Sequence, residues 1–144
     1  MFAVDEVTSH IKHHTSHMTN LVQFAGHKYL NLETYRRNGD PVLTPVWFAE
    51  DKGVFYLYSL ADAGKIKRIR RNPQVRIAPC SFRGELLGTW VEGKARILAD
   101  AEADRGDKLL DKKYGWQRKL GNFWRRVVPK ERAVVAIEPD STTS

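Results

Sequence analysis

The stretch from residue 54 to residue 80 constrains the fold more than any other part of the sequence. Residues 54 to 59 form an aromatic, β-rich run that predicts a strand. A short basic helix follows, and we expect Asp62 to cap its N-terminus. The Asn72-Pro73 pair ends the helix, because proline disfavours α geometry in the residue before it. The next strand is predicted directly after the helix, at residues 74 to 81.

The short helix between these strands admits two interpretations. Ile66 and Ile69 lie three residues apart and share an inward face, while basic residues crowd the other positions from 65 to 71. In one interpretation, the helix N-terminus and the early Lys65 form an anion pocket after the first strand. In the other, the helix is a solvated basic connection between two strands.

Alternating polarity and turn residues predict the remaining elements. The Asn38-Gly39 pair is typical of a tight hairpin, and Pro45 predicts an edge or an interruption in its strand, since proline donates no ladder hydrogen bond. Six strands joined mostly by hairpins, with one helix inserted midway, predict a mainly β fold, a small antiparallel barrel. Further strands are predicted at residues 29–35, 42–49, 87–98 (the longest) and 133–137, and helices at residues 100–114 and 116–127.

The length of 144 residues predicts a single domain that spans residues 1–144. Within it, we expect residues 1–19 to form a flexible N-terminal segment and residues 140–144 a polar tail. The first segment carries histidines at helical spacing, but a terminal segment offers no fixed scaffold, so no metal site is predicted.

The charge of the chain favours anionic partners. Twenty-four basic and 17 acidic residues give a net charge of +7, which suits phosphorylated cofactors, nucleic acids or acidic lipid surfaces without choosing among them. No apolar run approaches the ~18–20 residues of a membrane span, and the N-terminus has no signal-peptide core. The single cysteine, Cys80, fits a reducing compartment. We therefore expect a soluble, cytoplasmic protein.

The usual catalytic signatures are missing from the sequence. It contains no Gly-x-Ser-x-Gly elbow, Walker loop, Gly-x-Gly-x-x-Gly turn or Cys/His zinc pattern. Cys80 lies on a predicted strand, where packing explains a thiol, and neither Cys80 nor His27 is assigned a catalytic role. An enzyme with this sequence would leave the hard chemistry to a cofactor.

Four segments, in order, resemble the pyridoxamine 5′-phosphate oxidase-like split barrels that bind flavins and deazaflavins. Residues 32–48 (LETYRRNGDPVLTPVWF) resemble the paired opening strands of that family, and residues 64–80 (GKIKRIRRNPQVRIAPC) resemble its phosphate-binding lysine and the strand after it. Arg83-Gly84 and residues 90–96 (WVEGKAR) continue in register. The resemblance is closest to the subgroup that depends on the deazaflavin coenzyme F420.

The resemblance implies a six-stranded antiparallel split-barrel homodimer with the cofactor in a groove at the subunit interface. Trp47 and Trp90 are candidate interface contacts, because aromatic residues are enriched at such interfaces. The implied phosphate contacts are Lys65, with Ser59, Ala63 and Gly64 around it, and the implied contacts of the isoalloxazine-type ring are Thr44, Pro45, Val46 and Trp47.

Two positions depart from the family pattern. Ser59 stands where threonine is commoner but keeps a hydroxyl group, and Ala63 stands where some relatives carry an arginine. Lys67 or Arg68 would compensate for that lost phosphate contact, and the sequence does not choose between them.

The function implied is that of an oxidoreductase that transfers a hydride between its cofactor and a small organic substrate. Coenzyme F420 is the first choice of cofactor and FMN the second. One alternative is a cofactor-binding protein without turnover, a store or a sensor. Another is a nucleic-acid-binding module built on residues 65–76, but the exposed stacking aromatics of common single-strand readers are missing there. We therefore expect neither a nucleic-acid nor a membrane partner.

Overall fold

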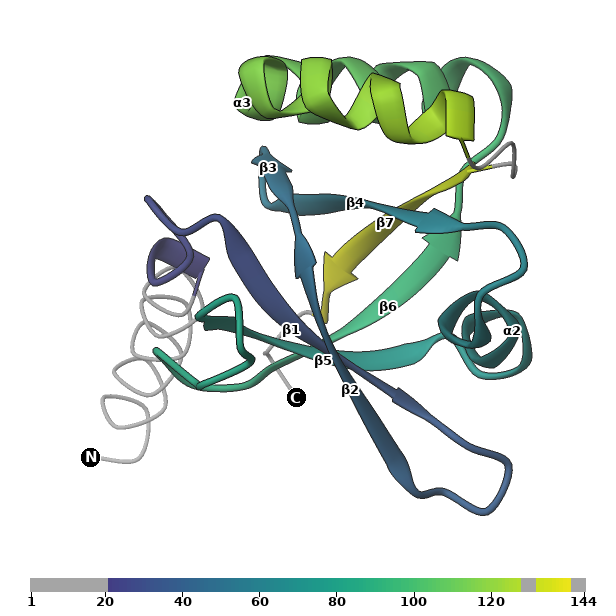
Figure 1. Cartoon of the computed structure of the whole chain (residues 1–144). Helices are drawn as coiled ribbons and strands as arrows, with labels where there is room; N and C mark the ends of the chain where they lie inside the picture. Colours follow the sequence, from purple (N-terminus) through teal and green to yellow (C-terminus); the bar gives the residue numbers. More distant parts are fainter. Residues whose placement is uncertain (1–20, 128–131, 141–144) are drawn as a thin grey trace.

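In the part of the chain that the structure describes, seven β-strands form one curled antiparallel sheet, and the helices α2 and α3 pack against it (Figure 1). The structure is a computed structural model that describes residues 21–127 and 132–140, without the side chains of residues 115–127. Its elements are β1 (Tyr29–Tyr35), β2 (Pro41–Trp47), β3 (Ala49–Asp51), β4 (Val54–Leu60), α2 (Gly64–Arg71), β5 (Gln74–Cys80), β6 (Val91–Ile97), α3 (Asp100–Val127) and β7 (Arg132–Pro139).

The two edges of the sheet are formed by consecutive strands. The sheet order is β2-β1-β5-β6-β7-β4-β3, and only Phe48 separates β2 from β3 in the chain. One stretch of chain therefore runs along one edge and continues at the other, which curls the sheet into a half-barrel. The predicted mainly β antiparallel barrel is confirmed, with seven strands in place of six, because the predicted strand 42–49 divides at Phe48.

The core fills the inside of the curled sheet. Side chains alternate between the two faces of a strand, and the inward ones, such as Leu32 and Phe55, are fully buried. The helix α2 adds Ile66 and Ile69 to the same cluster, as their spacing predicted. Full burial of a large apolar side chain contributes roughly 1.5–3 kcal/mol, so these two residues hold α2 against the barrel.

The start of α2 differs from the prediction. The helix begins at Gly64 with Ala63 as its N-cap and has no side-chain cap hydrogen bond, so the prediction that Asp62 caps it is wrong. The backbone is satisfied differently: the Ala63 N–H donates to the Leu60 carbonyl at 3.0 Å, and the Ala63 carbonyl accepts from Ile66 at 3.1 Å. The predicted end is confirmed, since Asn72 has extended geometry.

The strand predicted for residues 87–98 is shorter than expected. The strand β6 begins only at Val91, and β7, with eight residues, is the longest. Residues 81–90 form a loop instead, in which the Ser81 N–H donates to the Glu85 carbonyl and Gly84 adopts a φ of +88°. Within β6 the predicted alternation holds: Val91, Gly93 and Ala95 are buried, whereas Glu92, Lys94 and Arg96 are exposed on the other face.

The helix α3 lies over β3, β4 and β7 (Figure 1) and joins the two predicted helices into one. It has non-helical geometry at Tyr114 (φ −118°, ψ 24°), close to the gap that the sequence predicts at residue 115. The kink coincides with the residue whose hydroxyl contacts the backbone of Phe48.

The edge position of β2 agrees with its prolines. Pro45 lies opposite Asn31 in the ladder with β1 and does not interrupt the strand; the break comes at Phe48. The hairpin from β1 to β2 turns at Gly39, with a φ of +90° that favours glycine. The predicted segment 1–19 and residues 141–144 lie outside the described residues.

Candidate functional site

The four residues predicted at the phosphate site lie together where β4 passes into α2. The Ser59 side chain, 6% exposed, ends the inward row of β4, and its hydroxyl donates to the Leu60 carbonyl at 3.1 Å. Three residues after the strand ends, Ala63 and Gly64 open the helix and Lys65 occupies its first turn. A hydroxyl group, free backbone N–H groups and an ammonium group thus converge in one short run of chain.

Lys65 is half-buried, and within the described residues it forms no ion pair. Loss of water around the ammonium group, followed by the nearby charge of Arg68, lowers the pKa of Lys65 below its usual value of 10.5. A cation that has lost part of its hydration gains by binding an anion. The environment of Lys65 therefore favours a negatively charged ligand.

Arg68 is held close to the same helix N-terminus. Its Nε donates to the hydroxyl of Thr34 at 2.7 Å, and Thr34 is only 1% exposed. Its guanidinium lies beside Gly64, because a Cβ built on that glycine would come within 2.8 Å of the Arg68 Nη1. Lys67 is exposed on the same helix. Of the two residues that could replace the missing arginine at position 63, only Arg68 has a fixed position beside Gly64.

The four residues predicted along the ring lie on β2 but do not share a face. Thr44 and Val46 pair with Leu32 and Leu30, the inward residues of β1, whereas Pro45 and Trp47 pair with Asn31 and Tyr29 on the outer face. Only the strand edge is common to all four residues. A planar ligand could therefore meet all four only along the edge of β2, which pairs with β1 alone.

The strand β1 connects the residues predicted at the phosphate site with those predicted along the ring. Thr34, which accepts the hydrogen bond from Arg68, pairs with Val42, and the next inward pair along the ladder contains Thr44. The helix α2 packs against β1 and β4, and β2 packs against β4. The end of β1 nearest the hairpin turn and the helix α2 thus lie side by side.

Trp47 has aromatic partners within the chain. Its ring stacks on Tyr114 with centroids 5.0 Å apart and an interplanar angle of 10°, and it lies 6.3 Å from the ring of Tyr29. Trp90, the other predicted interface residue, lies under the guanidinium of Arg76 at 4.7 Å. Both indole rings are half-buried in the single chain.

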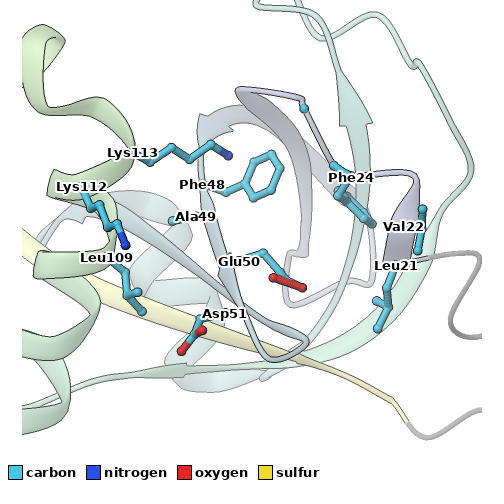
Figure 2. Close-up of a pocket in the computed structure, with 12 residues that line it drawn as sticks. Leu21, Val22, Phe24, Phe48, Ala49, Glu50, Asp51, Leu109, Lys112 and Lys113 are labelled. Carbon is cyan, nitrogen blue, oxygen red and sulfur yellow. The ribbon is translucent and has the colours of Figure 1, made fainter.

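A second feature, which the sequence did not reveal, is a cavity of about 670 Å³ beside β3. It lies between the turn at residues 21–26, the bend at Phe48 and the helix α3, and none of the predicted site residues lines it (Figure 2). Its three walls come from distant parts of the chain, so no local pattern could have indicated it.

The amine of Lys113 is the most perturbed group at this cavity. Its Nζ lies 3.8 Å from the centroid of the Phe48 ring and donates to the His27 carbonyl at 2.9 Å (Figure 2). Loss of hydration, opposed by the charge of Glu50, lowers the pKa of Lys113 to about 8. The phenyl face also favours the charged amine. Lysines and carboxylates both line this cavity, so its charge does not favour one class of ligand.

The comparison with protein families identifies the chain. A family model described as pyridoxamine 5′-phosphate oxidase matches residues 19–143. The chain belongs to the pyridoxamine 5′-phosphate oxidase family. The resemblance seen in the sequence is thereby confirmed, and the curled antiparallel sheet is the split barrel of this family. A comparison with curated proteins finds no match.

Solved structures of the pyridoxamine 5′-phosphate oxidase-like fold resemble the chain at low sequence identity. The heme storage protein HutZ of Vibrio cholerae has a TM-score of 0.62 and 13% identity, over 83% of this chain and 86% of that one. An F420 reductase has a TM-score of 0.53 and 18% identity, over 83% and 93%. An FAD-binding protein of Mesorhizobium loti has a TM-score of 0.56 and 21% identity, over 83% and 84%. At such identities the likeness establishes the fold.

The described residues hold neither a helix that could span a membrane nor a cluster of metal-binding side chains. Among residues 21–127 and 132–140, no helix combines the length and the apolar character needed to cross a bilayer. The same residues contain no cluster of three or more His, Cys, Asp or Glu side chains placed to hold a metal ion. The histidines near the N-terminus fall outside this region.

Proposed function

We propose that this protein is an oxidoreductase that binds a phosphorylated flavin-type cofactor and transfers a hydride between it and a small organic substrate. One observation carries the proposal: Lys65, half-buried and without an ion pair among the described residues, lies at the N-terminus of α2. A phosphate group would restore the interactions that its ammonium has lost.

The donors at the start of α2 fit a phosphate. The first turn of α2 offers backbone N–H groups, and Lys65 offers a full positive charge. The Ser59 hydroxyl, which donates to the Leu60 carbonyl, would have to turn to donate to a phosphate. Gly64 carries no Cβ, and the guanidinium of Arg68 lies in the space that a side chain there would take.

When bound, a flavin or deazaflavin ring would supply the hydride chemistry. The protein would bind the phosphate at Lys65 and Ser59 and orient the ring along the edge of β2. Trp47 would help to exclude water, because its stacking on Tyr114 fixes an apolar surface at that edge. No described side chain is assigned as a proton donor.

Coenzyme F420 remains the first choice of cofactor and FMN the second. The net charge of +7 suits the acidic tail of F420, and a protein whose name is F420 reductase shares the fold. We further propose a homodimer, a cytoplasmic location consistent with the unpaired Cys80, and no nucleic-acid or membrane partner.

The visible spectrum of the protein purified from its own cells tests the proposal. We expect flavin absorbance or the fluorescence of a deazaflavin, and hydride transfer to one of a panel of quinones, nitro compounds and enones when the reduced cofactor is supplied. Absence of a chromophore, together with failure of the apoprotein to bind either FMN or F420 at micromolar concentrations, would contradict the proposal.

Binding without turnover is the second candidate, and the likeness to a heme storage protein supports it. A store or a sensor would bind the cofactor tightly but would not accelerate its reoxidation by any acceptor. The two candidates therefore separate by the rate at which bound, reduced cofactor is reoxidised, measured with and without the protein.

A further inference from the structure

A row of arginines extends from the proposed phosphate site along one face of α2. Gly64, Arg68 and Arg71 are spaced four and three residues apart, which places them on the same side of a helix. Arg68 donates to the Thr34 hydroxyl, and Arg71 Nη2 donates to the Tyr35 carbonyl at 3.0 Å. Two successive residues of β1, Thr34 and Tyr35, thus hold Arg68 and Arg71.

These positive charges repel one another and are not neutralised within the described structure. Loss of hydration, and then the charges of Arg36 and Arg71, lower the pKa of Arg68, and Arg68 in turn contributes to the lowered pKa of Lys65. None of these four side chains forms an ion pair with a described carboxylate. A ligand with negative charges would relieve this repulsion.

The position of Arg68 depends on the absence of a side chain at residue 64. A Cβ there would approach Arg68 Nη1 to 2.8 Å, a separation too short for the guanidinium to keep its place. Lys67 and Arg70, the neighbouring cations on α2, are exposed, and no described hydrogen bond or ion pair fixes either of them. Position, and not charge alone, therefore distinguishes Arg68.

We infer that Arg68 is the second cation of the anion site, and that Arg71 extends this site to take a ligand with several separated negative charges. The inference rests on the proposed function for the identity of the ligand. FMN carries only its phosphate, whereas coenzyme F420 carries further acidic groups in its tail. Lys65 and Arg68 serve both cofactors, and Arg71 favours the one with the longer array of charges.

Calorimetric titration of the full chain with three probes, FMN, coenzyme F420 and inorganic pyrophosphate, tests this inference. We expect Arg68→Gln to weaken all three by about 10- to 150-fold, as is typical for loss of a hydrogen bond to a charged group. Arg70→Gln removes the same charge from the same helix and serves as the matched control. We expect it to change the affinity for each probe by less than about threefold, and Lys67→Gln to do the same. Arg71→Gln should weaken F420 binding at least threefold more than FMN binding.

Gly64→Ala separates the position of Arg68 from its charge. The variant keeps every cation but displaces the guanidinium, so we expect anion affinity to fall several-fold while the thermal midpoint stays within a few degrees of the parent. An Arg70→Gln or Lys67→Gln effect as large as that of Arg68→Gln would overturn the inference in favour of diffuse charge.

The probes also separate this inference from the proposed function. If neither cofactor binds but pyrophosphate binds in an Arg68-dependent way, the proposed function fails and the anion site stands. If a cofactor binds and Arg68→Gln leaves its affinity unchanged, the proposed function stands and the inference fails. If the parent protein binds none of the three probes, both fail.

Discussion

Lys65 is a residue whose charge state and ligand affinity are linked. Its pKa is lowered in the folded protein by loss of hydration and by Arg68, and a bound phosphate would raise that pKa again. Anion affinity should therefore be greatest while the amine is protonated, at pH values below its lowered pKa. It should fall as the pH rises through that pKa.

Replacing Lys65 by alanine should weaken cofactor binding by about 10- to 150-fold, from the ~1.5–3 kcal/mol of a hydrogen bond to a charged group. The loss of affinity at high pH should also become smaller in the variant. Folding should change little, because trimming a side chain that lies half in solvent leaves no large cavity. Titrations with FMN and F420 between pH 7 and pH 10, with a thermal melt, check both. Unchanged affinity for both cofactors would place the phosphate elsewhere.

A buried carboxylate on the outer face of β1 makes a second prediction at this scale. The side chain of Glu33 accepts from Arg76 Nε and Nη2 at 2.8 and 2.9 Å and from the Tyr35 hydroxyl at 2.6 Å. The hydrogen bond from Arg76 is the largest cause that lowers the pKa of Glu33 below its ordinary value of 4.5. Its stabilising effect is complete above that value and is lost as pH falls through the lowered pKa.

Glu33→Gln should therefore destabilise the protein at pH 7 by about 1.5–3 kcal/mol, and the difference from the parent should shrink as the pH falls below 4.5. Urea unfolding at pH 7 and pH 3.5 measures both values. Glu102→Gln removes the partner of Arg96 in an exposed pair, and its expected cost is below about 1 kcal/mol. Equal costs for the two variants would show that burial gives the Glu33 pair no advantage.

At the scale of elements, α3 is joined to the sheet through the hydroxyl of Tyr114. The group accepts from the Phe48 N–H at 3.1 Å, contacts the Phe48 carbonyl, and lies 2.7 Å from the Lys28 carbonyl. These contacts satisfy the backbone at the bend between β2 and β3. Burial raises the pKa of Tyr114 to about 12, so the hydroxyl keeps its proton at any physiological pH.

Tyr114→Phe should cost about 1–3 kcal/mol, because it leaves buried backbone groups of Phe48 without their partner. The aromatic ring remains, so its stacking on Trp47 is retained and the experiment isolates the hydroxyl group. Tyr29→Phe is the control, since no described hydrogen bond uses that hydroxyl, and we expect a change within about 0.5 kcal/mol. A Tyr114→Phe variant as stable as the parent in urea would mean that water forms hydrogen bonds with the backbone groups of Phe48 in place of the hydroxyl.

The elements that the sequence predicted well are those in which local pattern and tertiary packing agree. Period-two alternation located β1 and the part of the predicted strand 87–98 that forms β6. The Asn72-Pro73 pair located the end of α2. The segment at residues 87–90 has strand-like composition, but Gly88 packs against Pro79 and Gln23. Such tertiary contacts override a local preference and have no signature in the sequence.

The residues of the candidate site also fall into those that the sequence could place and those that it could not. Ser59 and Lys65 could be placed from sequence because they are close in the chain and flank one turn. The choice between Lys67 and Arg68 could not be made from the sequence, because it depends on Thr34, which only the folded sheet brings beside Arg68. The alternation of Thr44 and Trp47 between two faces follows from the register with β1, and the cavity at Phe48 follows from three distant segments.

At the scale of the whole molecule, apolar side chains on the surface bear on its assembly. Phe82, Leu86 and Leu87, in the loop before β6, are 66%, 48% and 55% exposed, and Leu43 on the edge strand β2 is 51% exposed. Three of these four residues lie within six positions of one loop, and an exposed apolar surface of this kind is typical of a protein interface. We expect light scattering to give the mass of a homodimer at micromolar concentration with cofactor bound. A monomer that still binds its cofactor would contradict the dimer.

The place of β7 in the sheet has a consequence for how the chain folds during synthesis. The strand β7 lies between β6 and β4 and pairs with both, so that Phe55 of β4, for example, pairs with Ile137. Pairings so distant in sequence close late, because the loop between them must first be ordered. While the ribosome still holds residues 132–139, the β4 edge that they will cover and the free edge of β6 both lack a partner. A chain stalled at that point would expose two strand edges at once, the kind of surface that chaperones bind and that aggregation recruits.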